Sequence, residues 1–183
     1  MSGAKDYELE YLYEIREHTR KHKKCFAIHA GEKDSSDIDR ALELEPDIFI
    51  HLTHANKKDL KKVKDIGASV VVCPRSNLVT KVGLPPIREM IETGITVGVG
   101  TDNVMLNSVN MFSEMEFLSK LFSLESRQIF KMCTLNSAKI LKLDKYIGSI
   151  LKGKRARLII FNKNSNNLIY MDVPFGISKA EES

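Results

Sequence analysis

The sequence predicts an α/β protein built around a parallel β-sheet, and two observations carry this prediction. Short apolar runs begin near residues 25, 47, 69 and 95, so strand-like segments recur after 22, 22 and 26 residues. Helical patterns lie between them, and strands that alternate with helices at such a period are typical of parallel βα units. Each run is almost continuously apolar, which indicates strands buried on both faces. We therefore expect a parallel sheet covered by helices.

The elements follow one another in a regular order. They are a helix over 6–24, a strand over 25–29, a helix over 35–45, a strand over 47–51, a helix over 56–67, a strand over 69–73, a Pro-rich loop, a helix over 86–94, a strand over 95–102, and helices over 111–122, 125–132 and 136–142. Apolar residues at helical spacing define the first helix, and lysines fill its last turn. No strand-like segment precedes that helix.

Local signals mark the ends of two further helices. Asn56 is placed to cap the start of one helix, and Gly67 ends it. Pro86 begins the next helix and Gly94 ends it. Residues 147–167 then change character and are expected to form short strands separated by Gly and Asn.

Composition and charge argue against several classes of function. The 28 Lys and Arg residues against 24 Asp and Glu residues give a formal charge of +4, which is only mildly basic. The densest basic runs, 20–24 and 57–64, lie in helical patterns without interleaved aromatic residues, so we expect no nucleic-acid partner. No apolar run approaches ~18 residues and no signal peptide opens the chain, so no membrane partner is expected. The three cysteines are far apart and form no CxxC, which indicates reduced thiols in a cytoplasmic protein.

Three of the four predicted strands finish in residues that can bind a metal or move a proton. These residues are His29, His51 and Asp102, whereas the third strand finishes at Cys73–Pro74. The carboxyl ends of parallel strands open on one face, where functional residues gather. Each residue alone could be a capping aspartate or a satisfied core histidine. Their regular recurrence predicts a shared site.

The residue types at these strand ends suit metal-assisted hydrolysis. His and Asp are natural ligands of zinc or a similar divalent ion, and a hydrolytic zinc keeps one position open for water. Such a metal lowers the pKa of its water to about 7. Glu32 lies three residues beyond His29, where a carboxylate can carry a proton to a leaving group. His51 can orient the attacking water, and His54, three residues further on, is a weaker candidate.

Four motifs in order resemble the amidohydrolase superfamily. They are "HAGE" at 29–32, "FIHLTHA" at 49–55, "VVVCPRSN" at 70–77 and "GVGTDN" at 98–103. The branch they resemble contains chlorohydrolases, guanine deaminase and S-adenosylhomocysteine/methylthioadenosine deaminase. The resemblance implies that His29 binds the metal and Glu32 is the proton shuttle. It also implies that His51 contacts substrate or the metal-bound water, and that Asp102 is both metal ligand and base.

The resemblance covers only the second half of that family's barrel. The family's first strand carries an HxH pair of metal ligands, and this sequence has no HxH. A complete (β/α)₈ barrel needs ~250 residues. The implied fold is therefore α/β, a partial TIM barrel with strands five to eight and their helices over residues 1–143. Residues 144–183 are expected to form part of a small β domain, with "GKRARLII" standing for the usual "GKDADLVV".

Two hypotheses follow for the function. In the first, the chain is part of an enzyme that hydrolyses a C–N bond, deaminating a purine- or pyrimidine-like small molecule with zinc, or alternatively iron. In the second, it is a non-catalytic half-barrel that serves as an interaction module or truncated product. Either way the isolated chain is expected to be inactive, and an N-terminal barrel half or a second copy of the chain is the expected partner. Arg75 and Asn77 of "PRSN" are candidates for substrate binding, with purely structural roles as the alternative.

Overall fold

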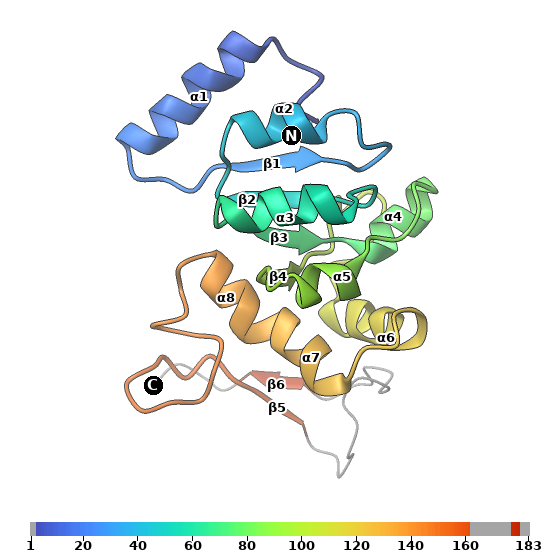
Figure 1. Ribbon diagram of the computed structural model, residues 1–183. Helices are drawn as coiled ribbons and strands as arrows, with labels where there is room; N and C mark the ends of the chain where they lie inside the picture. Colours follow the sequence, from blue (N-terminus) through green and yellow to red (C-terminus); the bar gives the residue numbers. More distant parts are fainter. Residues whose placement is uncertain (1–2, 162–176, 180–183) are drawn as a thin grey trace.

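A computed structural model shows a four-stranded parallel sheet with helices packed around it (Figure 1). The structure describes residues 3–161 and 177–179. The strand order is β1-β2-β3-β4, so sequential strands are neighbours and β1 and β4 are the two edges. All three pairings are parallel. The predicted parallel α/β architecture is confirmed.

The bounds of the elements place each predicted strand at its expected position. In chain order they are α1 (Leu9–Lys21), β1 (Ala27–Ala30), α2 (Ile38–Glu43), β2 (Ile48–His51), α3 (Lys57–Asp65), β3 (Ser69–Val72), α4 (Pro74–Thr80), α5 (Ile87–Glu92), β4 (Val97–Val99), α6 (Met111–Leu121), α7 (Ser126–Lys131), the π-helical segment η1 (Met132–Asn136), α8 (Ser137–Ile140), β5 (Ile159–Phe161) and β6 (Ile177–Lys179). The strands are shorter than the apolar runs, since each run continues into the turns at its ends.

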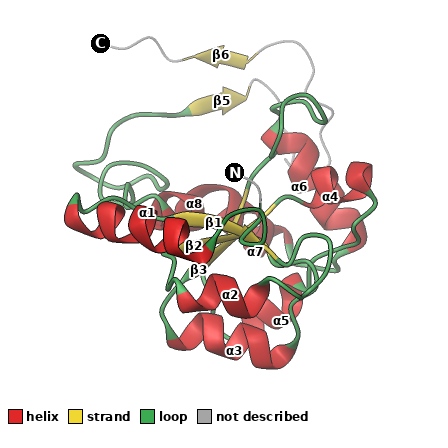
Figure 2. Ribbon diagram, turned by 90° about the horizontal axis from the view of Figure 1, so that it is seen from above, coloured by secondary structure: helices red, strands yellow, loops and turns green. Residues whose placement is uncertain are grey.

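The two faces of the sheet differ in burial. Figure 2 shows α2, α3 and α5 gathered on one face. The strand residues on the buried face are Ile28, Ala30, Phe49, Val70, Val72, Val97 and Val99. On the other face, His29, Ile50 and Val71 form one row across the strands and are only half-buried. The prediction that both faces are buried therefore holds fully for one face and in part for the other, where Ile48 and Gly98 are buried.

Helix α3 shows how local sequence sets an element. The side chain of Asn56 accepts hydrogen bonds from the backbone N–H groups of Lys58 and Asp59. The Asp59 side chain in turn accepts from the backbone N–H of Asn56, which completes a capping box. Leu60 and Val63 lie one helical turn apart and are both fully buried against the core.

Two helical features differ from the prediction. Helix α4 occupies residues that were expected to form a Pro-rich loop, and Pro74 stands at its first helical position. Proline suits that position because its backbone nitrogen needs no hydrogen bond there. The two helices predicted over 125–132 and 136–142 form one continuous run, because η1 joins α7 to α8. Figure 1 shows this run beside edge strand β4.

Both edges of the sheet have contacts from outside it. Gly3 forms an isolated parallel bridge with His29 on β1, so a strand-like contact does precede the first helix. At the other edge, the side-chain amide of Asn136 donates a 2.9 Å hydrogen bond to the carbonyl of Val97 on β4. Beyond the sheet, β5 pairs with β6 in antiparallel fashion. Residues 162–167 of the predicted short strands lie outside the described residues. Within the described part of the chain, every helix is too short or too polar to cross a membrane.

Candidate metal and proton-transfer site

The candidate site is built at the carboxyl ends of β1 and β2. The two strands pair in register, with His29 opposite Ile50 and Ala30 opposite His51. His51 has a positive φ of 75°, which is uncommon for a residue with a side chain. Gly31, directly after β1, also has a positive φ, and a Cβ there would lie 2.9 Å from Ile38. This turn brings Glu32 back toward the strand ends.

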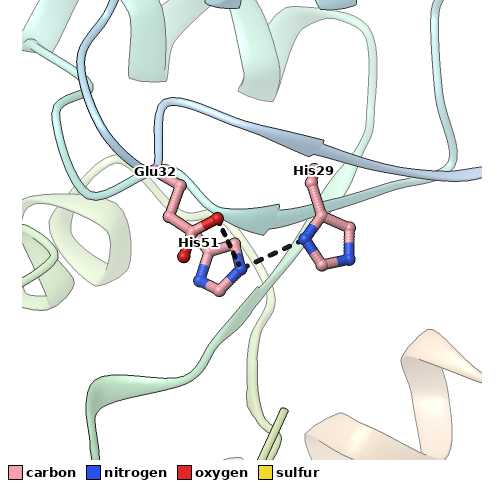
Figure 3. A group of neighbouring side chains, drawn as sticks. All are labelled: His29, Glu32 and His51. Carbon is pink, nitrogen blue, oxygen red and sulfur yellow. Dashed lines mark hydrogen bonds and ion pairs between the residues drawn. The ribbon is translucent and has the colours of Figure 1, made fainter. Parts of the chain in front are cut away.

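His29, Glu32 and His51 point toward one another (Figure 3). The Nε2 atom of His51 lies 3.2 Å from Nδ1 of His29 and 3.6 Å from Oε2 of Glu32. One ligand atom from each of the three residues falls within 4.8 Å of the others. His51 is fully buried, whereas His29 and Glu32 are half-buried. The arrangement places two nitrogen donors and one carboxylate around a single point.

A hydrogen-bond chain fixes the orientation of the His51 ring. The side-chain N–H of Asn77 donates to Oγ1 of Thr53 at 2.7 Å, which turns the carbonyl oxygen of Asn77 toward His51. That oxygen lies 3.0 Å from Nδ1 of His51. Because a carbonyl oxygen only accepts, Nδ1 carries the proton. In the neutral ring, Nε2 then has a free lone pair directed at His29 and Glu32.

His29 is held in its neutral form. Burial is the largest cause that lowers its pKa from 6.5 to about 4, and the neighbouring charge of His51 adds to this effect. The carboxylate of Asp102 opposes the shift. At neutral pH the His29 ring therefore carries a lone pair, which is the form that binds a metal.

Asp102 stands outside the three-residue cluster. It follows β4, has a positive φ of 59°, and accepts a 2.5 Å hydrogen bond from Oγ of Ser76 at its Oδ2 atom. Its charge is close enough to affect the pKa of His29. The sequence predicted Asp102 as a ligand together with His29. In the structure the residue that joins His29 and Glu32 is His51.

The two predicted substrate-binding residues both have protein partners. Asn77 is fully buried and contacts His51 and Thr53. The Arg75 guanidinium lies 3.5 Å from the buried carboxylate of Glu114 and donates to Ser108. Both side chains therefore hold the structure around the site, which was the alternative interpretation of the sequence. Substrate contact by either residue stays a prediction.

Some residues near the site were not singled out from the sequence. Ser76 was inside the quoted "PRSN" motif, and its position in the first turn of α4 directs its hydroxyl at Asp102. Thr53 lies two residues beyond His51, and its position just after the carboxyl end of a predicted strand could have indicated it. Glu114 gives no local signal, because its contact with Arg75 spans 39 residues of sequence. The weaker candidate His54 is exposed, and its Nε2 lies 2.8 Å from the carbonyl of Val82, so it serves the neighbouring loop.

Comparisons with known proteins show which sequences this chain is similar to. The sequence matches the model of the amidohydrolase family over residues 2–181. An uncharacterized protein of Methanocaldococcus jannaschii is 36% identical over 93% of this chain and 49% of its own length. A 5-methylthioadenosine/S-adenosylhomocysteine deaminase of Thermoanaerobacter pseudethanolicus is 31% identical over 88% of this chain and 38% of its own length.

A solved structure shows the same fold. An adenosine deaminase from Xanthomonas campestris with bound zinc superposes with a TM-score of 0.75 at 23% identity, over 83% of this chain and 40% of that one. This chain spans less than half of the length of each of these proteins.

Proposed function

The chain belongs to the amidohydrolase family, and from this premise we propose that it is the C-terminal half of a metal-dependent hydrolase that cleaves C–N bonds. The proposed reaction is the deamination of a purine- or pyrimidine-like small molecule. The convergence of His29, Glu32 and His51 is the observation that carries the proposal. The deaminase relative at 31% identity supports the reaction type.

The proposed architecture is half of a (β/α)₈ barrel. In it, β1 to β4 are the fifth to eighth strands within residues 1–143, and residues 144–183 belong to a small β domain. Two sheet edges that are only partly covered and a half-buried inner row of residues support this assignment. The partner is then an N-terminal barrel half that closes the sheet, or a second copy of the chain. The three free cysteines agree with a cytoplasmic setting.

The donor set fits a divalent metal of the zinc type. His29 offers a neutral imidazole as a metal ligand, and the lone pair of His51 beside it is left for the water. Asp102, in the segment after β4, would add an anionic ligand, and its charge already acts on His29. Zinc is the proposed metal for these imidazole and carboxylate ligands, with iron as the alternative. When bound, such a metal acts as a Lewis acid that makes water a nucleophile near neutral pH.

Three residues of this chain have separate roles in the proposed reaction. Oε2 of Glu32 accepts a proton from the attacking water as its oxygen bonds to the ring carbon that bears the amino group. Glu32 then gives that proton to the amino nitrogen, so that the C–N bond breaks and ammonia leaves. Nε2 of His51 accepts a hydrogen bond from the water and orients it. Asp102, whose charge acts on His29, is proposed as a second base.

The test is reconstitution. The chain is co-expressed with the N-terminal half of a family relative that supplies the HxH pair, and the purified pair is analysed for metal and screened for ammonia release from aminopurines and aminopyrimidines. We expect zinc and ammonia release from the pair, and neither from the chain alone. A stable pair that binds metal but releases no ammonia from any compound would contradict the proposal.

The alternative is a non-catalytic half-barrel. A pair that forms without binding metal would support it.

A further inference from the structure

Glu114 on α6 is a fully buried carboxylate that the proposed chemistry does not use. Its Oε1 atom lies 3.5 Å from Nη1 of Arg75 and 3.4 Å from the side-chain nitrogen of Asn107. Its Oε2 atom is buried without a hydrogen-bond partner among the described residues. Burying a carboxyl group costs free energy unless the group is hydrogen-bonded or paired with a charge.

The contacts of Glu114 join three parts of the molecule. Arg75 belongs to α4, Asn107 to the segment between β4 and α6, and Glu114 itself to α6. Arg75 also donates to Oγ of Ser108, one residue beyond Asn107, at 3.3 Å. Figure 1 shows α4 and α6 on the side toward which the strand arrows point. The carboxyl group therefore connects the segments that follow β3 and β4.

Both connected segments hold Asp102, one through a hydrogen bond and the other through the backbone. Helix α4 carries Ser76, whose hydroxyl donates to Asp102, and the segment 103–110 begins at the residue after it. Asp102 has a positive φ of 59°. A non-glycine residue keeps such a conformation only where the surrounding structure holds it. The same helix carries Asn77, which fixes the ring of His51.

We propose that Glu114 is a positioning residue that holds α4 against the segment 103–110 and thereby fixes Asp102 and His51 for the reaction. Glu114 acts through Arg75 and Asn107, and it touches neither substrate nor the reacting atoms. The link to the reaction rests on the proposed function, whereas the link to the two segments rests on contacts alone.

For this positioning role, the shape of the Glu114 side chain matters more than its negative charge. Burial raises the pKa of Glu114 to about 7, against the opposing effect of the Arg75 charge. Near neutral pH a large fraction of the group is therefore protonated. Glutamine has the same shape and keeps an acceptor oxygen for Asn107 and Arg75. Rescue by glutamine thus separates positioning from a requirement for charge.

The first experiment needs no activity. Amide hydrogen exchange is measured on the full chain for wild type, Glu114→Ala, Glu114→Gln and the control Glu116→Ala on the same helix. We expect Glu114→Ala to speed exchange about tenfold or more in 103–110 and in the first turn of α4, with β1 and β2 unchanged. Glu116→Ala should match wild type, and Glu114→Gln should not speed exchange in either segment. Unchanged exchange in Glu114→Ala, or equal effects of alanine and glutamine, would overturn the proposal.

A milder variant covers the case in which Glu114→Ala does not fold. Asn107→Ala removes one donor to Glu114 and leaves the buried carboxyl group with Arg75. The same two segments should exchange faster, by a smaller factor, in a chain whose core protection is intact. No local change in this variant would overturn the proposal.

The second experiment uses the pair reconstituted with an N-terminal half. Glu114→Ala should lower kcat about 10- to 100-fold with little change in KM, because misplacement of catalytic groups affects the chemical step. Glu114→Gln should restore most of the rate. A rise in KM alone would overturn the link to catalysis. If local exchange responds as expected but the wild-type pair is inactive, the positioning of the segments stands and the proposed function fails.

Discussion

At the scale of single residues, two buried groups give the chain opposite responses to pH. The folded state lowers the pKa of His29 to about 4, so stability is lost as pH falls from 6.5 through 4. It raises the pKa of Glu114 from 4.5 to about 7, so the stability from this group is full below 4.5 and is lost as pH rises through 7. The two effects oppose each other over much of the same range.

Glu114→Gln should separate these two contributions. Near pH 4.5 the variant and wild type should have similar free energies of unfolding, because both side chains are neutral. At pH 8 the variant should be the more stable, by on the order of 2 kcal/mol, since it avoids a buried negative charge. Urea unfolding at pH 4.5, 6 and 8 measures the difference. Parallel pH profiles would mean that the carboxyl group has the same pKa in the folded and the unfolded chain.

The cluster at the strand ends permits a sharper test of roles in the reconstituted pair. Glu32→Gln should abolish turnover and leave the metal content nearly intact, because glutamine keeps the shape but cannot accept a proton. His29→Ala and Asp102→Ala should lower the metal content as well. Metal analysis alongside an ammonia assay distinguishes the two classes. A Glu32→Gln variant with near-normal rate would move the proton transfer to another residue.

The sequence predicted the site residues that local position can identify. His29, His51 and Asp102 were found because each ends an apolar run, and such ends meet at one face of a parallel sheet. The role of Asn77 in fixing His51 was not predictable, because the two residues are 26 positions apart and nothing in the sequence gives their orientation. The burial of Glu114 was hidden for the same reason.

At the scale of elements, the capping box of α3 gives a prediction about stability. Asn56 accepts from two backbone N–H groups that otherwise lack a helical partner. Asn56→Ala should therefore lower the free energy of unfolding by ~1 kcal/mol, whereas Asn56→Asp should cost little. Chemical unfolding of the three proteins at one pH measures this. Equal stabilities would show that packing of Leu60 and Val63 fixes the helix without its cap.

The elements also show where pattern and structure diverge. The strands were predictable because a strand that is buried on one face and half-buried on the other has few polar residues. Helix α4 was not, since Pro74 and Asn77 are common in loops and its seven residues are too few for a clear apolar period. The break expected between α7 and α8 is absent because a π-helical turn carries the backbone through.

At the scale of the whole molecule, the open face and edges of the sheet predict self-association. Ile50 and Val71 are only half-buried in the row that a closed barrel would bury, and Ala27 at the β1 edge is exposed. The contacts of Gly3 and Asn136 cover only part of the two edges. The isolated chain should therefore dimerise or aggregate with rising concentration. Light scattering after sizing measures this, and a sharp monomer of 20.7 kDa at all concentrations would contradict it.

The order of strands and helices followed from the spacing of apolar segments in the sequence, but the burial of the two sheet faces did not. Segment spacing fixes strand order when each crossover is short, and the order β1-β2-β3-β4 agrees. Apolar runs were interpreted as strands with two covered faces, yet His29, Ile50 and Val71 of the inner row are only half-buried. A run such as "VVV" at 70–72 indicates that side chains pack against the inner face of the sheet. The sequence alone does not say whether those side chains belong to this chain or to a partner.

The backbone at the end of β2 also shapes how this chain can vary. His51 and Leu52 have φ angles of 75° and 47°, where Gly and Asn are least strained and β-branched residues are outliers. In a saturation library at position 51 that is selected only for folding, Gly and Asn should be enriched over Val and Ile. Selection of the same library for turnover should return histidine alone. Replacement of His51 by glycine would then give a folded scaffold with space for an imidazole added from solution.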